Sequence, residues 1–111
     1  MLMAMDEKRQ FQRAEFNGEA LVEHGKTSFR AMVRDLSVGG VYILASEKPP
    51  FGAMVKVTLQ LPALAEKKRP SVLVGIVRWV RDDGFGVQFG PTGAADTYAL
   101  AEYVARKTLQ I

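Results

Sequence analysis

The chain contains no cysteine and a single histidine, His24. The first absence excludes a disulfide framework, and the two together remove the thiolate and imidazole clusters that hold zinc or iron. The sequence also has no apolar run near the roughly 20 residues of a membrane-spanning helix, and its apolar start, MLMAM, is too short for a signal-peptide core. We therefore expect a cytoplasmic protein with no metal site, no cofactor and no membrane insertion.

Charge and length limit the function further. The 111 residues, of which 48% are apolar, suffice for one domain with a single core. With 15 basic and 12 acidic side chains the net charge is +3, which favours a compact anionic ligand. It falls short of the dense basic surface that sequence-independent nucleic-acid binding needs. Nucleic acid is therefore not an expected partner.

Short segments of alternating polarity begin at Glu15. In SFRAMVR, Phe29, Ala31 and Val33 share one face, and the alternation recurs in VYILA, MVKVTLQL, VLVGIVRWV and FGVQF. This pattern predicts about six antiparallel strands joined by turns. A small sheet hides its edges by closing, so the expected fold is all-β with one helix, a six-stranded antiparallel β-barrel followed by a C-terminal α-helix.

The helix is expected after Pro91-Thr92-Gly93, where apolar residues recur at helical spacing in two alternative sets. These are Tyr98, Ala101, Ala105 and Leu109, or Leu100, Val104 and Thr108. The helix could cover an open end of the barrel or pack against another copy, so the chain is a monomer or a homodimer. The expected organisation is a single domain over 1–111, with a flexible leader at 1–13, the barrel at 14–90 and the helix in 91–111. The stretch 62–70 is interpreted as an exposed loop.

Two short motifs carry the candidate chemistry. In the leader, Arg9 and Arg13 are separated by three residues, and two guanidinium forks suit a ligand that offers guanine edges and phosphates. The spacing alone is weak evidence, because Arg30 and Arg34 share it by chance. The leader pair differs in lying outside the barrel, where it is free to wrap a ligand.

The second motif is DLSVGG, residues 35–40, between the second and third expected strands. Gly39 and Gly40 are expected to supply a turn with positive φ. The Asp35 carboxylate can accept hydrogen bonds from the N1 and N2 donors of guanine, and the Ser37 hydroxyl can serve a phosphate or a base. Together the two motifs suit a guanine nucleotide.

With these motifs in this order, followed by GIVRWV and FGVQF, the chain resembles the PilZ domain family, bacterial receptors for cyclic dimeric GMP (c-di-GMP). The resemblance covers nearly the whole chain and implies a six-stranded antiparallel barrel. It implies that Arg9 and Arg13 grip the ligand as the leader folds over it, while Asp35, Ser37 and Gly40 form the barrel side of the site. Binding would order the leader and create a surface for an effector protein, in a process such as motility, biofilm formation or virulence.

Further ligand contacts are assigned a secondary rank. A basic residue at Lys8 is associated in the family with a stacked pair of ligands, although a solvated lysine is an equal interpretation. Trp79 resembles a late-strand aromatic of the family that lies near the guanine, where the alternative is a core residue. Arg78 should point to the face opposite Trp79, and Gly39 allows close backbone approach.

Enzymatic activity is not expected. Hydrolysis of a phosphodiester normally calls for clustered metal-binding carboxylates or histidines, and the paired acids Asp82 and Asp83 precede Gly84 in an expected hairpin. The alternative function is that of a PilZ adaptor that acts without ligand, through protein partners in pilus assembly or motility. The intact motif residues argue for ligand binding.

Overall fold

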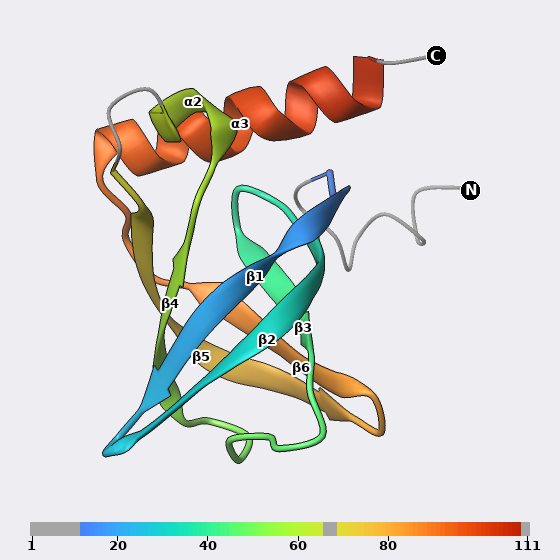
Figure 1. Cartoon of the computed structure of the whole chain (residues 1–111), viewed down its shortest axis with the longest axis vertical. Coiled ribbons are helices and arrows are strands. Elements are labelled where there is room, and N and C mark those ends of the chain that lie inside the picture. Colours follow the sequence, from blue (N-terminus) through green and yellow to red (C-terminus); the bar gives the residue numbers. More distant parts are fainter. Residues whose placement is uncertain (1–11, 66–68, 110–111) are drawn as a thin grey trace, which may run out of the picture.

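Six antiparallel strands close into a barrel in the computed structural model, which describes residues 12–65 and 69–109 (Figure 1). The strand order around the barrel is β1-β2-β3-β6-β5-β4. The bounds are β1 Ala14–His24, β2 Thr27–Leu36, β3 Gly40–Leu44, β4 Met54–Leu59, β5 Ser71–Arg81 and β6 Gly84–Phe89. With the C-terminal helix α3, Ala94–Leu109, this architecture confirms the fold expected from the sequence.

The core follows from the alternation of the strands. Inward residues such as Val33, Ile43, Val57 and Val77 are almost fully buried, and burial of each such side chain stabilises the fold by about 1.5–3 kcal/mol. The barrel is therefore filled by apolar side chains, and a ligand site has to lie on its outer wall or at its ends.

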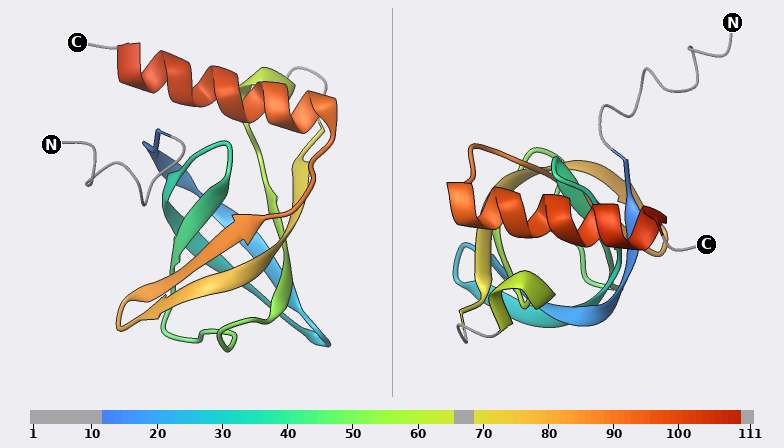
Figure 2. Two further views of the ribbon diagram at one scale, coloured as in Figure 1. Left: turned by 180° about the vertical axis from the view of Figure 1, so that it is seen from behind. Right: turned by 90° about the horizontal axis from the view of Figure 1, so that it is seen from above.

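Helix α3 lies across one end of the barrel (Figure 2). It buries Leu100 and Val104 in the common core, whereas Tyr98 is 64% exposed. Of the two alternative faces, the one containing Leu100 and Val104 therefore packs on the barrel, because Tyr98 lies on the opposite side. The Tyr103 hydroxyl donates to the Glu15 carbonyl oxygen at 2.5 Å, which fastens the helix to the start of β1.

The first part of the stretch from Pro62 to Pro70 differs from the expected exposed loop. Pro62–Ala65 form a short helix, α2, beside α3, and Leu61 and Leu64 on either side of Ala63 are buried. These leucines help to close the end of the barrel, whereas Pro62, Arg69 and Pro70 are exposed as expected. Residues 66–68 lie outside the described residues.

The pairing of the strands shifts at three places, one of them between Glu15 and Gly18 of β1, and the other two bring onto one face residues that strict alternation would separate. The pairing of β2 with β3 shifts between Val33 and Asp35, and the pairing of β5 with β6 shifts between Val77 and Trp79. In each bulge one extra residue enters the strand, so two successive side chains can share the outer face. The bulge residues are Arg34 in β2 and Arg78 in β5.

Candidate functional site

The Asp35 carboxylate lies between two arginines on the outer wall of the barrel. Arg13 Nε donates to Oδ1 at 2.7 Å and Arg34 Nε donates to Oδ2 at 2.9 Å. The side chains of Arg13 and Asp35 are 21% and 17% exposed, whereas that of Arg34 is 50% exposed. Because Leu36 after it and Val33 before it both face the core, the bulge at Arg34 is what turns Asp35 outward.

Opposing effects act on the protonation of Asp35. Partial burial raises the pKa of this carboxyl. The hydrogen bonds and charges of Arg34 and Arg13 together lower the pKa by more than burial raises it, so the pKa lies below the ordinary value. The same pairing raises the pKa of the Arg34 guanidinium, although burial opposes it. Asp35 is thus an ionised acceptor at neutral pH, with both of its neighbours cationic.

The guanidinium group of Arg34 also stacks on an aromatic ring. Its guanidinium carbon lies 4.0 Å from the centre of the Tyr42 ring, a cation–π contact. The Tyr42 hydroxyl donates to Asp83 Oδ1 at 2.6 Å, and its pKa is raised by burial and by this hydrogen bond. Tyr42 is buried, although it does not belong to the cluster of apolar core residues. Because Asp83 holds the Tyr42 hydroxyl, the two residues together fix the position of the ring on which Arg34 lies.

The turn after Asp35 is built by Ser37. This side chain is only 2% exposed, and its Oγ accepts hydrogen bonds from the N–H groups of Gly39 and Gly40 at 3.1 and 3.2 Å. The Ser37 N–H donates to the Gly40 carbonyl at 2.8 Å. In this structure the hydroxyl therefore shapes the turn, and its contact with a ligand stays a prediction.

The expected positive φ at Gly39 and Gly40 is wrong, since the glycines with positive φ in the described ranges are Gly25 and Gly52. Gly40 is required for a different reason. A Cβ at this position would lie 2.4 Å from the carbonyl oxygen of Val87 on β6, closer than real side chains approach. The close packing of β3 on β6 therefore excludes any side chain there.

Trp79 lies on the same cross-strand row as Asp35. Asp35 pairs with Tyr42, Tyr42 with Gly86, and Gly86 with Trp79. A Cβ on Gly86 would lie 2.5 Å from the Trp79 ring, so the indole covers this glycine while remaining 45% exposed. Trp79 is thus not a core residue. Three strand steps around the closed barrel separate it from Asp35, so contact of both residues with one ligand stays a prediction.

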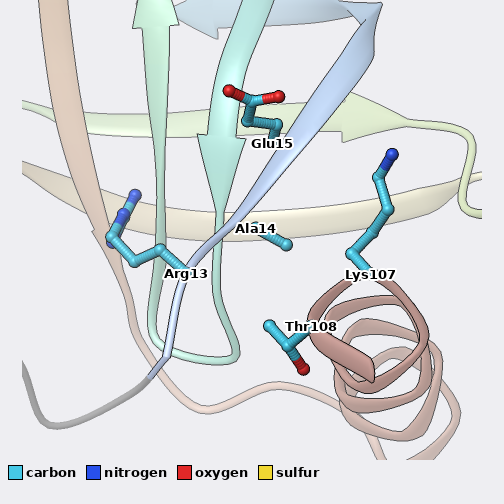
Figure 3. A pocket seen from close by; sticks show the side chains of 5 residues that line it. All are labelled: Arg13, Ala14, Glu15, Lys107 and Thr108. Carbon is cyan, nitrogen blue, oxygen red and sulfur yellow. The ribbon is translucent and has the colours of Figure 1, made fainter. Parts of the chain in front are cut away.

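The outer-wall site continues toward the helix. An open pocket of about 330 Å³ lies between the start of β1 and the last turns of α3, lined by Arg13, Ala14, Glu15, Lys107 and Thr108 (Figure 3). Arg13 points away from α3, and Lys107 lies on the other side of β1. Arg13 therefore lines the pocket and also pairs with Asp35. The pocket has a cationic side chain on either side, Arg13 and Lys107.

The structure brings Arg13, Asp35 and the turn of Ser37 to Gly40 together at one place on the barrel wall. Arg78 is exposed on β5, and the bulge removes the strict opposition to Trp79 that alternation suggested. Arg9 and Lys8 lie outside the described residues.

Arg34, Tyr42 and the pocket residue Lys107 were not expected from the sequence to belong to the site. Strict alternation placed Arg34 on the face opposite Asp35, and nothing in the sequence marks the bulge. Tyr42 could have been found, because it is the one outward residue between two core residues of β3.

Clusters of metal-ligating side chains and membrane-spanning helices are both absent from the ranges 12–65 and 69–109. No group of three or more His, Cys, Asp or Glu side chains there could hold a metal ion, and no helix in these ranges is long and apolar enough to cross a membrane.

The outer wall of the barrel carries an anionic acceptor flanked by guanidinium donors and, elsewhere, an exposed indole. The carboxylate and the guanidinium groups can read the hydrogen-bonding edge of a base and attract phosphates, and an exposed indole can stack a base.

Solved structures similar to this chain have the same fold. The inhibitor of motility MotI/DgrA of Bacillus subtilis is 20% identical, with 91% of this chain and 51% of that chain covered and a TM-score of 0.76. The PilZ domain of YcgR from Escherichia coli with c-di-GMP is 10% identical, with 92% of each chain covered and a TM-score of 0.70. The PlzA protein of Borreliella burgdorferi in complex with c-di-GMP is 13% identical, with 93% and 43% covered and a TM-score of 0.67.

This chain spans about half the length of the MotI/DgrA structure. Comparison with the curated proteins found no match. The family model of the PilZ domain, however, matches residues 7–106, a range that includes both motifs and every strand of the barrel. The chain therefore belongs to the PilZ domain family.

Proposed function

We propose that this domain is a non-enzymatic receptor for c-di-GMP that changes conformation on binding and thereby regulates a partner protein. The observation that carries the proposal is the Asp35 carboxylate held on the outer wall between Arg13 and Arg34, beside the turn built by Ser37. An ionised acceptor with cationic neighbours matches a ligand whose guanines donate hydrogen bonds and whose phosphates are anionic.

Binding would proceed by exchange of partners. A carboxylate has about four acceptor positions, and the Nε atoms of Arg13 and Arg34 use two of them. The N1 and N2 donors of a guanine would take the remaining positions or displace Arg13. A displaced Arg13 could turn its guanidinium toward a phosphate or the guanine, acting with Arg9 as the family resemblance implies. Trp79, exposed on the same row, would stack the second base.

The start of β1 could pass this exchange to the helix. Arg13 is two residues from Glu15, whose carbonyl accepts the Tyr103 hydroxyl of α3, and the Phe16 ring lies edge to face against Tyr103 with centroids 5.2 Å apart. A movement of Arg13 would strain both contacts. The position of α3 would then depend on the ligand, which gives a partner protein something to read.

The comparisons suggest the kind of process. The structures of YcgR and PlzA contain c-di-GMP, and MotI/DgrA is described as an inhibitor of motility. We propose a similar role here, in motility, biofilm formation or virulence, through an effector protein.

One feature favours the alternative of an adaptor that needs no ligand. Met54, Val72 and Val74 are 65%, 47% and 44% exposed on the neighbouring strands β4 and β5. Exposed apolar patches often mark protein contacts. The two functions are compatible, since a receptor also needs a surface for its partner.

The proposal is tested by calorimetric titration of c-di-GMP into the wild type, Asp35→Ala and the matched variant Asp82→Ala. Asp82 is an exposed aspartate in the β5–β6 turn, remote from both motifs in the sequence. Asp35→Ala should lower the affinity at least tenfold, because it removes an acceptor for a charged or polar donor worth about 1.5–3 kcal/mol, and Asp82→Ala should bind like wild type. Equal affinity in the two variants would reject Asp35 as a ligand contact.

A further inference from the structure

Arg34 and Asp35 are adjacent in the sequence and, because of the bulge between Val33 and Asp35, share the outer face. Two successive strand residues would ordinarily point to opposite faces. The bulge thus sets a guanidinium directly beside a carboxylate, a donor group next to an acceptor group.

The orientation of this pair is fixed from three sides. Nε of Arg34 donates to Asp35 at 2.9 Å, the guanidinium lies on the Tyr42 ring at 4.0 Å, and Asp83 holds the Tyr42 hydroxyl at 2.6 Å. The Arg34 side chain is nevertheless 50% exposed. Among the hydrogen bonds within residues 12–65 and 69–109, Arg34 makes only that of Nε, so its two terminal amino groups are available as donors to a ligand.

The chemistry of the pair matches one edge of guanine. That edge carries, in order, the O6 acceptor, the N1 donor and the N2 donor, so an acceptor that takes N1 and N2 needs a donor beside it for O6. Adenine has an amino donor at the equivalent of O6 and an acceptor at N1. Its edge would set donor against guanidinium and acceptor against carboxylate, which is repulsive at both points.

We propose that Arg34 is a specificity-determining residue that donates to O6 of the guanine whose N1 and N2 donors are accepted by Asp35. The inference rests on the proposed function, because it concerns the same ligand. It adds a base-reading arginine that belongs to neither motif, on the rigid barrel wall. Arg34 thereby selects guanine over adenine, while a phosphate contact alone would not distinguish the two bases.

The test compares Arg34→Ala with Arg30→Ala. Arg30 lies on the same strand, its side chain is 69% exposed, and it forms an ion pair with Glu19 at 4.0 Å, so the control removes an equal charge away from Asp35. Each variant and the wild type are titrated with c-di-GMP and with the adenine analogue cyclic dimeric AMP, at concentrations high enough to measure weak binding. Thermal unfolding confirms that each variant is folded.

Arg34→Ala should lower the affinity for c-di-GMP at least tenfold relative to Arg30→Ala, the effect of losing one hydrogen bond from a charged donor. The affinity for the adenine analogue should change no more than in Arg30→Ala. Equal losses for the two ligands would overturn the inference and assign Arg34 to the phosphates. No loss relative to Arg30→Ala would overturn it as well.

A second variant covers the case in which Arg34→Ala does not fold. Arg34→Lys keeps the charge and the aliphatic stem but loses the planar fork held on Asp35 and Tyr42. Its affinity for c-di-GMP should fall while that for the adenine analogue is unchanged, and retention of full selectivity would contradict the inference. A wild-type protein that binds neither ligand would instead reject the proposed function itself.

Discussion

Replacement of Asp35 by asparagine should destabilise the domain at neutral pH. In acid the difference in stability between the variant and the wild type should disappear. The carboxylate accepts from Arg13 and Arg34 at 2.7 and 2.9 Å. Asparagine has nearly the same shape but no charge, and its one oxygen can accept from only one side of the group. The variant therefore removes the ion pairs while leaving the packing almost unchanged.

The size of the effect follows from the exposure of the partners. The Arg13–Asp35 pair is about four-fifths buried, with side chains 21% and 17% exposed, so the range for hydrogen bonds to charged groups, about 1.5–3 kcal/mol, applies at its lower end. Arg34 is half exposed, and an exposed pair contributes about 0.2–1 kcal/mol. We expect a total loss of about 2 kcal/mol, or roughly 8–16 °C in the unfolding midpoint of a domain of this size.

The pH dependence has a defined sign. The pKa of Asp35 in the folded state lies below its ordinary value, so the ionised carboxylate stabilises the fold fully above the pKa of an unfolded aspartate, about 3.9. The stabilisation is lost as the pH falls through the lower, folded pKa. Thermal unfolding followed by circular dichroism should therefore show a large gap between wild type and Asp35→Asn at pH 7 that closes toward pH 3 and below.

Asp82→Asn is the control, because this exposed aspartate lacks an ion pair within the described ranges. It should unfold like wild type throughout. The reasoning would be refuted if Asp35→Asn matched the wild type at pH 7, or if its deficit were as large in acid as at neutral pH.

Three other substitutions test the remaining contacts. Ser37→Ala should cost about 1–3 kcal/mol, because two N–H groups of the turn lose their acceptor, and a midpoint within about 2 °C of wild type would contradict this. Gly40→Ala should prevent folding or lower the midpoint by far more than Ser37→Ala, since its Cβ would meet the Val87 carbonyl at 2.4 Å, and normal thermal stability would show that β3 and β6 are not so close. Tyr103→Phe removes the hydroxyl that donates to Glu15 and should speed amide exchange in the last turns of the C-terminal helix, whereas unchanged exchange would remove this contact from the proposed coupling.

The regular parts of the fold were predictable from the sequence because each strand buries one face. Val33, Ile43 and Val57 each recur at a spacing of two with another apolar residue of the same strand, and all three are buried as that period predicted. The chemistry of the second motif was likewise visible in Asp35. Its residue type and turn-forming neighbours already indicated an acceptor at the junction of two strands.

What could not be predicted depends on breaks in the period. The bulge at Arg34 adds one residue to a strand, and only the tertiary pairing of β2 with β3 shows that Arg34 and Asp35 share a face. Gly40 was assigned to a turn conformation, but its requirement comes from Val87, which is 47 residues away in the sequence. Trp79 remains exposed because Gly86 on the next strand leaves room for its ring outside the barrel.

The central claim is tested most directly by calorimetric titration of the wild-type protein with c-di-GMP, with GTP and the adenine analogue as controls. The account predicts saturable binding that is selective for c-di-GMP. A stoichiometry near two per chain would support the additional role of Lys8, and a ratio near one would assign the site to a single ligand. A folded protein that fails to bind c-di-GMP, or binds all three nucleotides alike, would contradict the account and favour an adaptor that acts through protein contacts alone.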